Sequence, residues 1–438
     1  MNQKTFCNTA WYELHIYHNG DFGLCCAEEH RPDGADEFST VKSKYNIQNM
    51  NMREWYNSAI MQKLRKKFAC GSGALSNCVK CYLLESTSGH SRRHEQLQKS
   101  AIFPKHDFVE SYKQSPHHKH FISAKQHGLT STLPVDFHID LGNFCNAACK
   151  MCHAPASSKI AAQEFKWGNQ EAKAFIGTDW TKDSLVWHGF LEELVTFPIK
   201  NLHMMGGETL LTPRFEQMVD YLIEHNKFDI NISFVTNGTL YNDSLMQKLL
   251  KFQRIGIEVS AETMDERNAY IRLGTDFDTL VSNISKFKSI ADDKRITVTM
   301  RSAPSNLSIG TYHTLLKFCM DNHLLLSSTQ LDDPPYLEIK HLPDTIKQQY
   351  TQCYYQFAQQ YDLDLNNTSD DFNRKSMIEH RKVIAWHTQQ AIDLLKVPRD
   401  DDSDQQLQQM VAHSQKWDSV YKLDMLSLYP EFGSFVQT

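Results

Sequence analysis

The stretch from Val135 to Cys152 reads VDFHIDLGNFCNAACKMC, and it predicts a strand over residues 135–141 that runs into a cysteine-rich loop. The loop cysteines Cys145, Cys149 and Cys152 have the spacing C-x3-C-x2-C. Iron–sulfur clusters usually take four cysteine ligands. Three thiolates on one short loop can bind three irons of a cubane cluster, so the fourth iron keeps an open position for a substrate or cosubstrate.

The surrounding segment alternates predicted strands and helices. The strands are expected at 135–141, 201–205, 230–235, 255–259, 296–300 and 324–331, and helices at 215–224, 244–252 and 278–289. This order of elements favours a parallel α/β sheet. Six units favour a partial (β/α)6 TIM-like barrel over a closed barrel of eight units. Ligands of such sheets bind beyond the carboxyl ends of the strands.

Polar motifs follow the next three predicted strands at those ends. Gly206, Gly207 and Glu208 follow the second strand, Asn237 follows the third, and Ser260 follows the fourth. Glycines let backbone carbonyls approach an ammonium group closely, and the carboxylate of Glu208 adds an opposite charge. A lone Gly-Gly-Glu motif usually marks a turn, but its position after the next predicted strand favours a functional role at the ligand-binding edge of the sheet.

The cysteine loop and the Gly-Gly-Glu motif together resemble the radical S-adenosylmethionine (SAM) superfamily over residues 134–330. The resemblance implies a [4Fe-4S] cluster bound by Cys145, Cys149 and Cys152, with SAM chelated to the open iron. It also implies reductive cleavage of SAM to a 5′-deoxyadenosyl radical that abstracts hydrogen from a substrate. The family usually has an aromatic residue before the third cysteine, where this chain has Met151, although a thioether also packs well beside a cofactor.

The same resemblance assigns the contacts with SAM. The residues expected to bind SAM are Gly206, Gly207, Glu208, Asn237, Ser260 and Arg272. The Gly-Gly-Glu motif would hold the amino group, and Ser260 would contact the ribose or the carboxylate, with Glu262 as a weaker candidate. Arg272 would lie near the SAM carboxylate, and its alternative role is a surface salt bridge. The sequence assigns no catalytic residue that touches the substrate.

A second cysteine pattern precedes this core. Cys7 is followed by twelve residues, Gly20, four residues and Cys25, and then by Cys78 and Cys81 in a C-x2-C motif. The pattern resembles the twitch module, a shortened relative of the SPASM module, in which four cysteines bind an auxiliary iron–sulfur cluster, here expected to be [4Fe-4S]. In well-known relatives the module follows the catalytic domain, whereas here it precedes that domain.

Local signals support part of this pattern and leave alternatives open. Strands are expected at 11–17 and 22–26, because Asn19-Gly20 between them favours a tight hairpin turn. A helix is expected at 53–69. Cys26 could replace Cys25 as a ligand, and a tetrahedral zinc site with four cysteines is the alternative to a cluster.

The length of 438 residues is typical of two or three domains. We expect a twitch-like module over 1–115, a radical SAM core over 130–332, and a mostly helical C-terminal extension over 333–438. A His-rich linker is expected at 115–120. Hydrophobic residues make up 41% and charged residues 22%, as in soluble globular proteins, and a net charge of −6 gives no global basic field for nucleic acid.

The absence of long apolar runs predicts no membrane span, and the N-terminus lacks the apolar core of a signal peptide. A cytoplasmic location is therefore expected, where eleven cysteines favour metal ligation over disulfides. The favoured function is radical SAM chemistry on a peptide or protein, with electrons from a flavodoxin or ferredoxin. The alternatives are the same chemistry on a metabolite or nucleotide, and a non-catalytic metal-binding scaffold.

Overall fold

A computed structural model provides the structure of the chain. It describes residues 6–25, 28, 44–70, 76–88, 91–93, 124–130, 132–290, 295–331, 333–366, 368 and 377–436. The expected linker at 115–120 and Cys26 lie outside the described residues. The chain forms two compact units, of which unit 1 holds residues 1–144, 174–234 and 243–255, and unit 2 holds residues 145–173, 235–242 and 256–438.

Unit 1 contains a sheet with the strand order β2-β1-β3-β5-β6. The strands are β1 (Glu13–Ile16), β2 (Phe22–Gly23), β3 (Asp136–Asp140), β5 (Asn201–Met205) and β6 (Asn231–Thr236, of which the last two residues belong to unit 2). Strand β1 pairs in parallel with β3, β3 with β5, and β5 with β6, whereas β2 is antiparallel to β1. The N-terminal hairpin therefore extends the parallel sheet.

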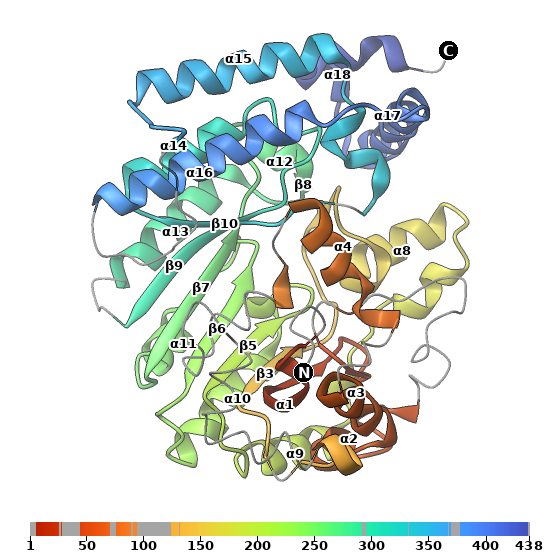
Figure 1. The fold of residues 1–438 in the computed structure, drawn as a ribbon, viewed down its shortest axis with the longest axis vertical. Coiled ribbons are helices and arrows are strands. Elements are labelled where there is room, and N and C mark those ends of the chain that lie inside the picture. The colour runs from red at the N-terminus through yellow and green to blue at the C-terminus, as the bar shows by residue number, and fades with distance from the viewer. Residues whose placement is uncertain are drawn as a thin grey trace. The chain divides into compact units, whose positions relative to one another are not determined.

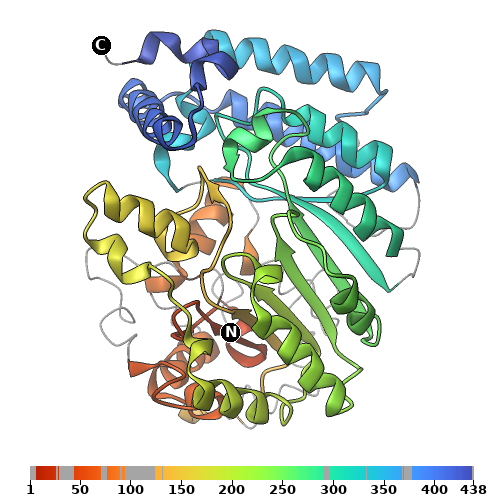
Figure 2. The same ribbon diagram turned by 180° about the vertical axis from the view of Figure 1, so that it is seen from behind.

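The helices of unit 1 are α1 (Thr9–Tyr12), α2 (Met52–Tyr56), α3 (Ala59–Cys70), α4 (Val79–Ser88), α9 (Ser184–Leu194), α10 (Pro213–Glu224) and α11 (Asp243–Leu249). Figure 2 shows α10 on one face of the green strands, where Phe215 packs against Phe234 of β6 with ring centroids 5.3 Å apart. Apolar side chains alternate toward the helices, for example Phe137 and Ile139 in β3. The intervening positions carry mainly polar side chains, such as His138 of β3 and His203 of β5, and form the polar face of the sheet.

Unit 2 contains the strands β7 (Arg254–Ser260, of which the first two residues belong to unit 1), β9 (Ile296–Ser302) and β10 (Leu325–Ser328) in the order β10-β9-β7. A separate two-stranded sheet pairs β4 (Ala148–Cys149) with β8 (Arg272–Leu273). The helices are α8 (Ser158–Lys166), α12 (Arg267–Ile271), α13 (Phe277–Ile290), α14 (Tyr312–Asn322), α15 (Asp344–Gln360), α16 (Met377–Lys396), α17 (Ser403–Tyr421) and α18 (Met425–Leu428). Figure 1 shows α14, α15 and α16 side by side, as their contacts require.

The mostly parallel α/β fold and the helical C-terminal segment confirm the predicted fold class, and each strand predicted in the core has a counterpart. Two N-terminal predictions were wrong in part. The strand expected at 11–17 begins only at Glu13, because Thr9–Tyr12 form α1. The helix expected at 53–69 is divided into α2 and α3, because Asn57 ends α2 and its side chain bonds with Arg65 and Thr130 instead. The three predicted domain ranges remain predictions.

Within the described part of the chain, every helix is too short or too polar to cross a bilayer.

A buried histidine in unit 2 makes stability depend on pH. His387 of α16 lies 3.1 Å from the carbonyl of Leu326 through Nε2 and 3.2 Å from Oγ of Ser328 through Nδ1. Burial lowers the pKa of His387 to about 4. Since an unfolded histidine has a pKa near 6.5, the unfolded state binds more protons between these values, and folding stability falls as pH decreases through that window.

We expect this group to remove up to about 3 kcal/mol of stability between pH 7.5 and pH 4. His387→Gln keeps two polar groups without the titration, so its free energy of unfolding should depend less on pH than that of the wild type. Urea unfolding at pH 7.5 and pH 5 measures the difference. An equal pH dependence in both proteins would contradict the assignment.

Candidate functional site

The three-cysteine loop lies in unit 2 and is held by the strand pair β4 and β8. Cys149 pairs with Arg272, and the backbone N–H of Lys150 donates to the carbonyl of Ile271 at 2.8 Å. Cys149 is buried, whereas Cys145 and Cys152 are half-buried, and all three are thiols outside any disulfide among the described residues. Free thiols on one loop are the ligands that iron–sulfur clusters take in proteins. The donor set therefore fits the predicted cluster.

The surroundings of the loop favour the thiolate form of Cys149, whereas the hydrogen bond with Cys149 and burial raise the pKa of Cys152. A hydrogen bond with Cys152 lowers the pKa of Cys149 below its ordinary value, and the positive charge of Arg272 adds to this effect against the cost of burial. Although burial opposes it, the charges of Cys149 and Glu262 raise the pKa of Arg272, and Cys145 and Cys152 act in the same direction. Arg272 therefore lies where its charge can offset negative charge on the three sulfur atoms.

Glu262 fixes Arg272 in this position. Nη1 of Arg272 lies 2.9 Å from Oε1 of Glu262, and the other carboxylate oxygen accepts hydrogen bonds from Oγ of Ser302 at 2.9 Å and from the backbone N–H of Ala303 at 2.8 Å. The Glu262 side chain is 2% exposed and that of Arg272 is 12% exposed. The alternative of a surface salt bridge for Arg272 was wrong, because this ion pair is buried beside the cysteines.

Asn237 binds the cysteine loop itself. Its Nδ2 donates to Oδ1 of Asn146 at 2.7 Å, and its Oδ1 accepts from the hydroxyl of Thr239 at 2.6 Å. Asn146 Nδ2 in turn donates to Thr239 at 2.8 Å. The side chain of Asn237 therefore positions the residue that follows Cys145. Ser260 is buried at the end of β7, the strand end at which it was expected.

The Gly-Gly-Glu motif lies in unit 1, where it packs on the residues just before Cys145. Gly206 and Gly207 have φ values of +90° and +55°. A Cβ on Gly206 would lie 2.5 Å from the carbonyl oxygen of Gly142, and one on Gly207 would lie 2.0 Å from that of Phe144. The backbone N–H of Glu208 donates to the same Phe144 oxygen at 2.7 Å. Only glycine allows this close approach.

Gly207→Ala is expected to displace the backbone of Phe144 and so the start of the cysteine loop. We expect about tenfold weaker SAM binding or more, which corresponds to ~1.4 kcal/mol, measured by equilibrium dialysis of the anaerobic protein. Gly189→Ala is the matched control, because no atom lies within 4 Å of a Cβ there and its φ is not positive. Unchanged SAM affinity in Gly207→Ala would refute this role of the glycine.

The four N-terminal cysteines of the predicted set all lie in unit 1. Burial raises the pKa of Cys7 to about 11, with a further contribution from the charge of Cys81. Burial and the charges of Cys78 and Cys7 likewise raise the pKa of Tyr82. The structure thus groups Cys7, Cys78 and Cys81. Cys25 lies near Tyr17, whose pKa is raised by burial, by Glu28 and by Cys25.

Arg93 brings a positive charge to the same group of cysteines. Its guanidinium forms an ion pair with Glu85, donates to the carbonyl of Phe6 at 2.9 Å, and lowers the pKa of Cys7 through its charge. The arginine therefore lies beside the N-terminal thiols, as Arg272 lies beside those of the core loop. All four cysteines of the predicted set are thiols outside any disulfide among the described residues, and their chemistry fits either a cluster or zinc.

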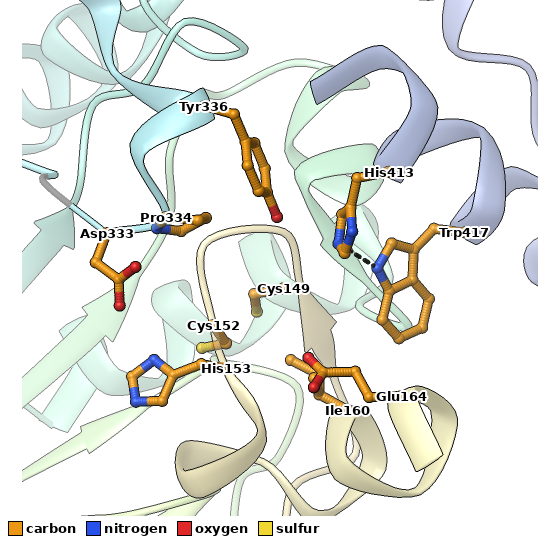
Figure 3. Close-up of a pocket in the computed structure, with 10 residues that line it drawn as sticks. All are labelled: Cys149, Cys152, His153, Ile160, Glu164, Asp333, Pro334, Tyr336, His413 and Trp417. Atoms are coloured by element: carbon orange, nitrogen blue, oxygen red, sulfur yellow. Dashed lines mark hydrogen bonds between the residues drawn. The ribbon is translucent and has the colours of Figure 1, made fainter. Parts of the chain in front are cut away.

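A cavity of about 110 Å³ in unit 2 opens onto two of the loop cysteines. Its lining consists of Cys149, Cys152, His153, Ile160, Glu164, Asp333, Pro334, Tyr336, His413 and Trp417. Figure 3 shows the indole nitrogen of Trp417 directed at His413, where it donates to Nε2 at 3.0 Å. Burial lowers the pKa of His413 to about 4. The imidazole is therefore neutral at pH 7, and its proton resides on Nδ1.

The C-terminal segment also contributes to this cavity, which no motif of the sequence indicates. Trp417 of α17 packs with Ala148, Ile160 and Leu273 around the cysteine loop, and Cys152 lies against this cluster. Asp418 accepts from the hydroxyl of Tyr270 at 2.8 Å. No sequence motif marks Trp417 or Asp418. More than 250 positions separate them from the cysteines, so only tertiary packing brings them to the loop.

Comparisons with known proteins identify relatives of the segment that carries the cysteine loop. Residues 139–300 match the family model described as the Radical SAM superfamily. These residues include the cysteine loop, the Gly-Gly-Glu motif and Arg272. Over these residues the chain is similar to the radical SAM superfamily, which confirms the resemblance proposed from its motifs.

The individual proteins similar to this chain have low sequence identity with it. The chain is 22% identical over 144 residues to the sporulation killing factor maturation protein SkfB of Bacillus subtilis (strain 168), a match that covers 33% of this chain and 30% of SkfB. The match thus spans less than a third of the curated relative.

Solved structures with a similar fold include SuiB of Streptococcus suis, at 17% identity and a TM-score of 0.39, over 65% of this chain and 59% of SuiB. SuiB has also been solved bound to the precursor peptide SuiA. A structure of anSMEcpe with bound AdoMet has 17% identity and a TM-score of 0.37, over 52% of this chain and 59% of that protein. These TM-scores lie below 0.5, so the likenesses support no further conclusion.

Proposed function

We propose that this chain is a radical SAM enzyme in which Cys145, Cys149 and Cys152 bind a [4Fe-4S] cluster. The observation that carries the proposal is the three-thiol loop beside the Arg272–Glu262 ion pair, within the segment that matches the family. A cluster bound there would supply the electron that cleaves SAM to methionine and a 5′-deoxyadenosyl radical. The radical would then take a hydrogen atom from the substrate.

The chain's own residues have distinct tasks in this proposal. Arg272 offsets the negative charge of the thiolates, and Glu262 holds its guanidinium in place. Asn237 positions the loop through Asn146. We assign the Gly-Gly-Glu motif to the SAM amino group, because its glycines leave room for a close approach and the carboxylate of Glu208 is buried. Ser260 is assigned to the ribose or carboxylate of SAM.

The first test is SAM cleavage by the anaerobically reconstituted full-length protein. With dithionite and SAM, we expect 5′-deoxyadenosine to accumulate, as measured by liquid chromatography, and its formation should require the reductant. A flavodoxin or ferredoxin should replace dithionite, since the reaction needs a one-electron donor. Iron-loaded protein that forms no 5′-deoxyadenosine would refute the proposal.

We further propose that Cys7, Cys25, Cys78 and Cys81 bind an auxiliary [4Fe-4S] cluster. The grouping of three of these thiols, with Arg93 beside them, supports the assignment. Cys78→Ala/Cys81→Ala should lower the iron content by about four atoms per chain. Loss of about one zinc with unchanged iron would identify a zinc site instead.

For the substrate we propose a peptide or protein. The support is the sequence match to SkfB, which is named a maturation protein, together with the twitch-like cysteine pattern. Small peptides encoded next to the gene would be incubated with SAM, reductant and the enzyme, and their masses compared with those from an enzyme-free control. A SAM-dependent mass change supports the proposal. Turnover of a metabolite or nucleotide, with none of any peptide, would favour the alternative.

A further inference from the structure

A row of imidazoles crosses the polar face of the sheet in unit 1. His15 of β1 is the register partner of His138 in β3, His138 is the partner of His203 in β5, and His203 is the partner of Ser233 in β6. Register partners on adjacent strands project from the same face of a sheet. Four neighbouring strands thus present polar groups side by side, on the face opposite the buried apolar residues.

The imidazoles are in direct contact. The ring centroids of His15 and His138 are 4.7 Å apart, as are those of His138 and His203. Nδ1 of His203 lies 2.7 Å from Oγ of Ser233. At this spacing, positive charge on neighbouring rings would be strongly unfavourable. Neutral imidazoles are the form in which histidine binds metal ions.

Asp140 adds a carboxylate to one end of the row. It lies two residues after His138 in β3 and therefore on the same face. One ring nitrogen of His15, one of His138 and one carboxylate oxygen of Asp140 all lie within 4.8 Å of one another. Ligands bound about 2 Å from one ion are at most about 4 Å apart. Small side-chain rotations would bring these atoms to a common ion.

Burying the carboxylate of Asp140 is unfavourable in free energy unless a cation lies beside it. Its Oδ1 is buried and forms no hydrogen bond with any of the described residues. A buried carboxylate that lacks a partner costs several kcal/mol unless a cation or a proton compensates it. This cost gives a second reason, independent of the imidazole row, to expect a positive ligand.

We propose that His15, His138 and Asp140 bind one divalent transition-metal ion. Two histidines and one carboxylate are the ligand set of many zinc and iron(II) sites. Three protein ligands leave a coordination position open, which is typical of metal ions that act on a substrate. The site uses none of the cysteines, so it is separate from both proposed clusters and does not depend on them.

One other set of side chains with comparable geometry occurs among the described residues. His341, Asp400 and Asp402 also have ligand atoms within 4.8 Å, but both aspartates are exposed. Lys340 already forms an ion pair with Asp400 at 2.9 Å. This exposed cluster therefore has its own positive charge and supplies a matched control.

The test compares zinc binding by three full-length proteins after cluster reconstitution: the wild type, Asp140→Asn and Asp400→Asn. Each is equilibrated with Zn²⁺ and a weak chelator, and zinc per chain is measured by mass spectrometry after gel filtration. We expect the wild type and Asp400→Asn to hold about one zinc more than Asp140→Asn. Equal zinc in all three proteins would overturn the proposal.

X-ray absorption at the zinc edge separates this site from the cysteines. Nitrogen and oxygen ligands at about 2.0–2.1 Å are expected, whereas zinc at the cysteines would show sulfur at about 2.3 Å. A sulfur-only environment would therefore also overturn the proposal. His138→Gln provides a second ligand variant should Asp140→Asn fold poorly, and it should lose the same zinc. The experiment measures metal content and not activity. A protein that fails to cleave SAM would therefore still give an interpretable zinc measurement.

Discussion

Alanine at Cys145, Cys149 and Cys152 together is expected to remove one cluster and abolish SAM cleavage. The wild type should contain about eight iron atoms per chain, and the triple variant about four, because a [4Fe-4S] cluster needs its cysteine ligands. Formation of 5′-deoxyadenosine should fall to the background without enzyme. Iron and sulfide analysis, with chromatography of the SAM products, gives both readouts on the same anaerobic sample.

The matched control for this triple variant is Cys353→Ala. Cys353 in α15 is also a half-buried free thiol, but it belongs to neither cysteine motif. It should keep the iron content and the SAM cleavage of the wild type. Full SAM cleavage by the triple variant would contradict the assignment of the loop. If the wild type contains about four iron atoms and the variant none, the assignment of the core cluster stands and an auxiliary iron–sulfur cluster is excluded.

Arg272→Met is expected to lower the free energy of unfolding by about 3–5 kcal/mol, because it leaves the buried charge of Glu262 without its partner. It also removes the positive charge beside the three thiols. Urea unfolding of the anaerobic protein measures the loss. Glu262→Gln/Arg272→Met should recover part of it, because a neutral amide replaces the orphaned carboxylate.

Lys317→Met supplies the comparison for an exposed ion pair. Lys317 pairs with Asp321 on the surface of α14, where both side chains are about half exposed. Exposed pairs contribute about 1 kcal/mol or less, so this variant should unfold almost as the wild type does. A similar small loss for Arg272→Met would show that the Arg272–Glu262 pair does not stabilise the cysteine loop.

The strands of the core were predictable because their signals are local. Apolar residues at alternate positions, as in β3 and β6, reflect one buried face, and glycine-rich turns mark the strand ends. The N-terminal segment was harder to predict. Thr9–Tyr12 has the aromatic composition of a strand but forms a helix, and the pairing of β1 with β3 joins residues more than 100 positions apart. Local propensity carries no information on such pairing.

The sequence by itself determined the class of this protein, because a C-x3-C-x2-C loop after a strand and a Gly-Gly-Glu turn after the next strand are short motifs with direct chemical meaning. Only the tertiary structure decided which groups surround them. Only the folded chain pairs Arg272 with Glu262 beside the thiols and packs Trp417 against the loop. The strand register places the imidazoles of unit 1 next to one another. Such contacts depend on strand register and long-range packing, in which residues distant in the chain become neighbours.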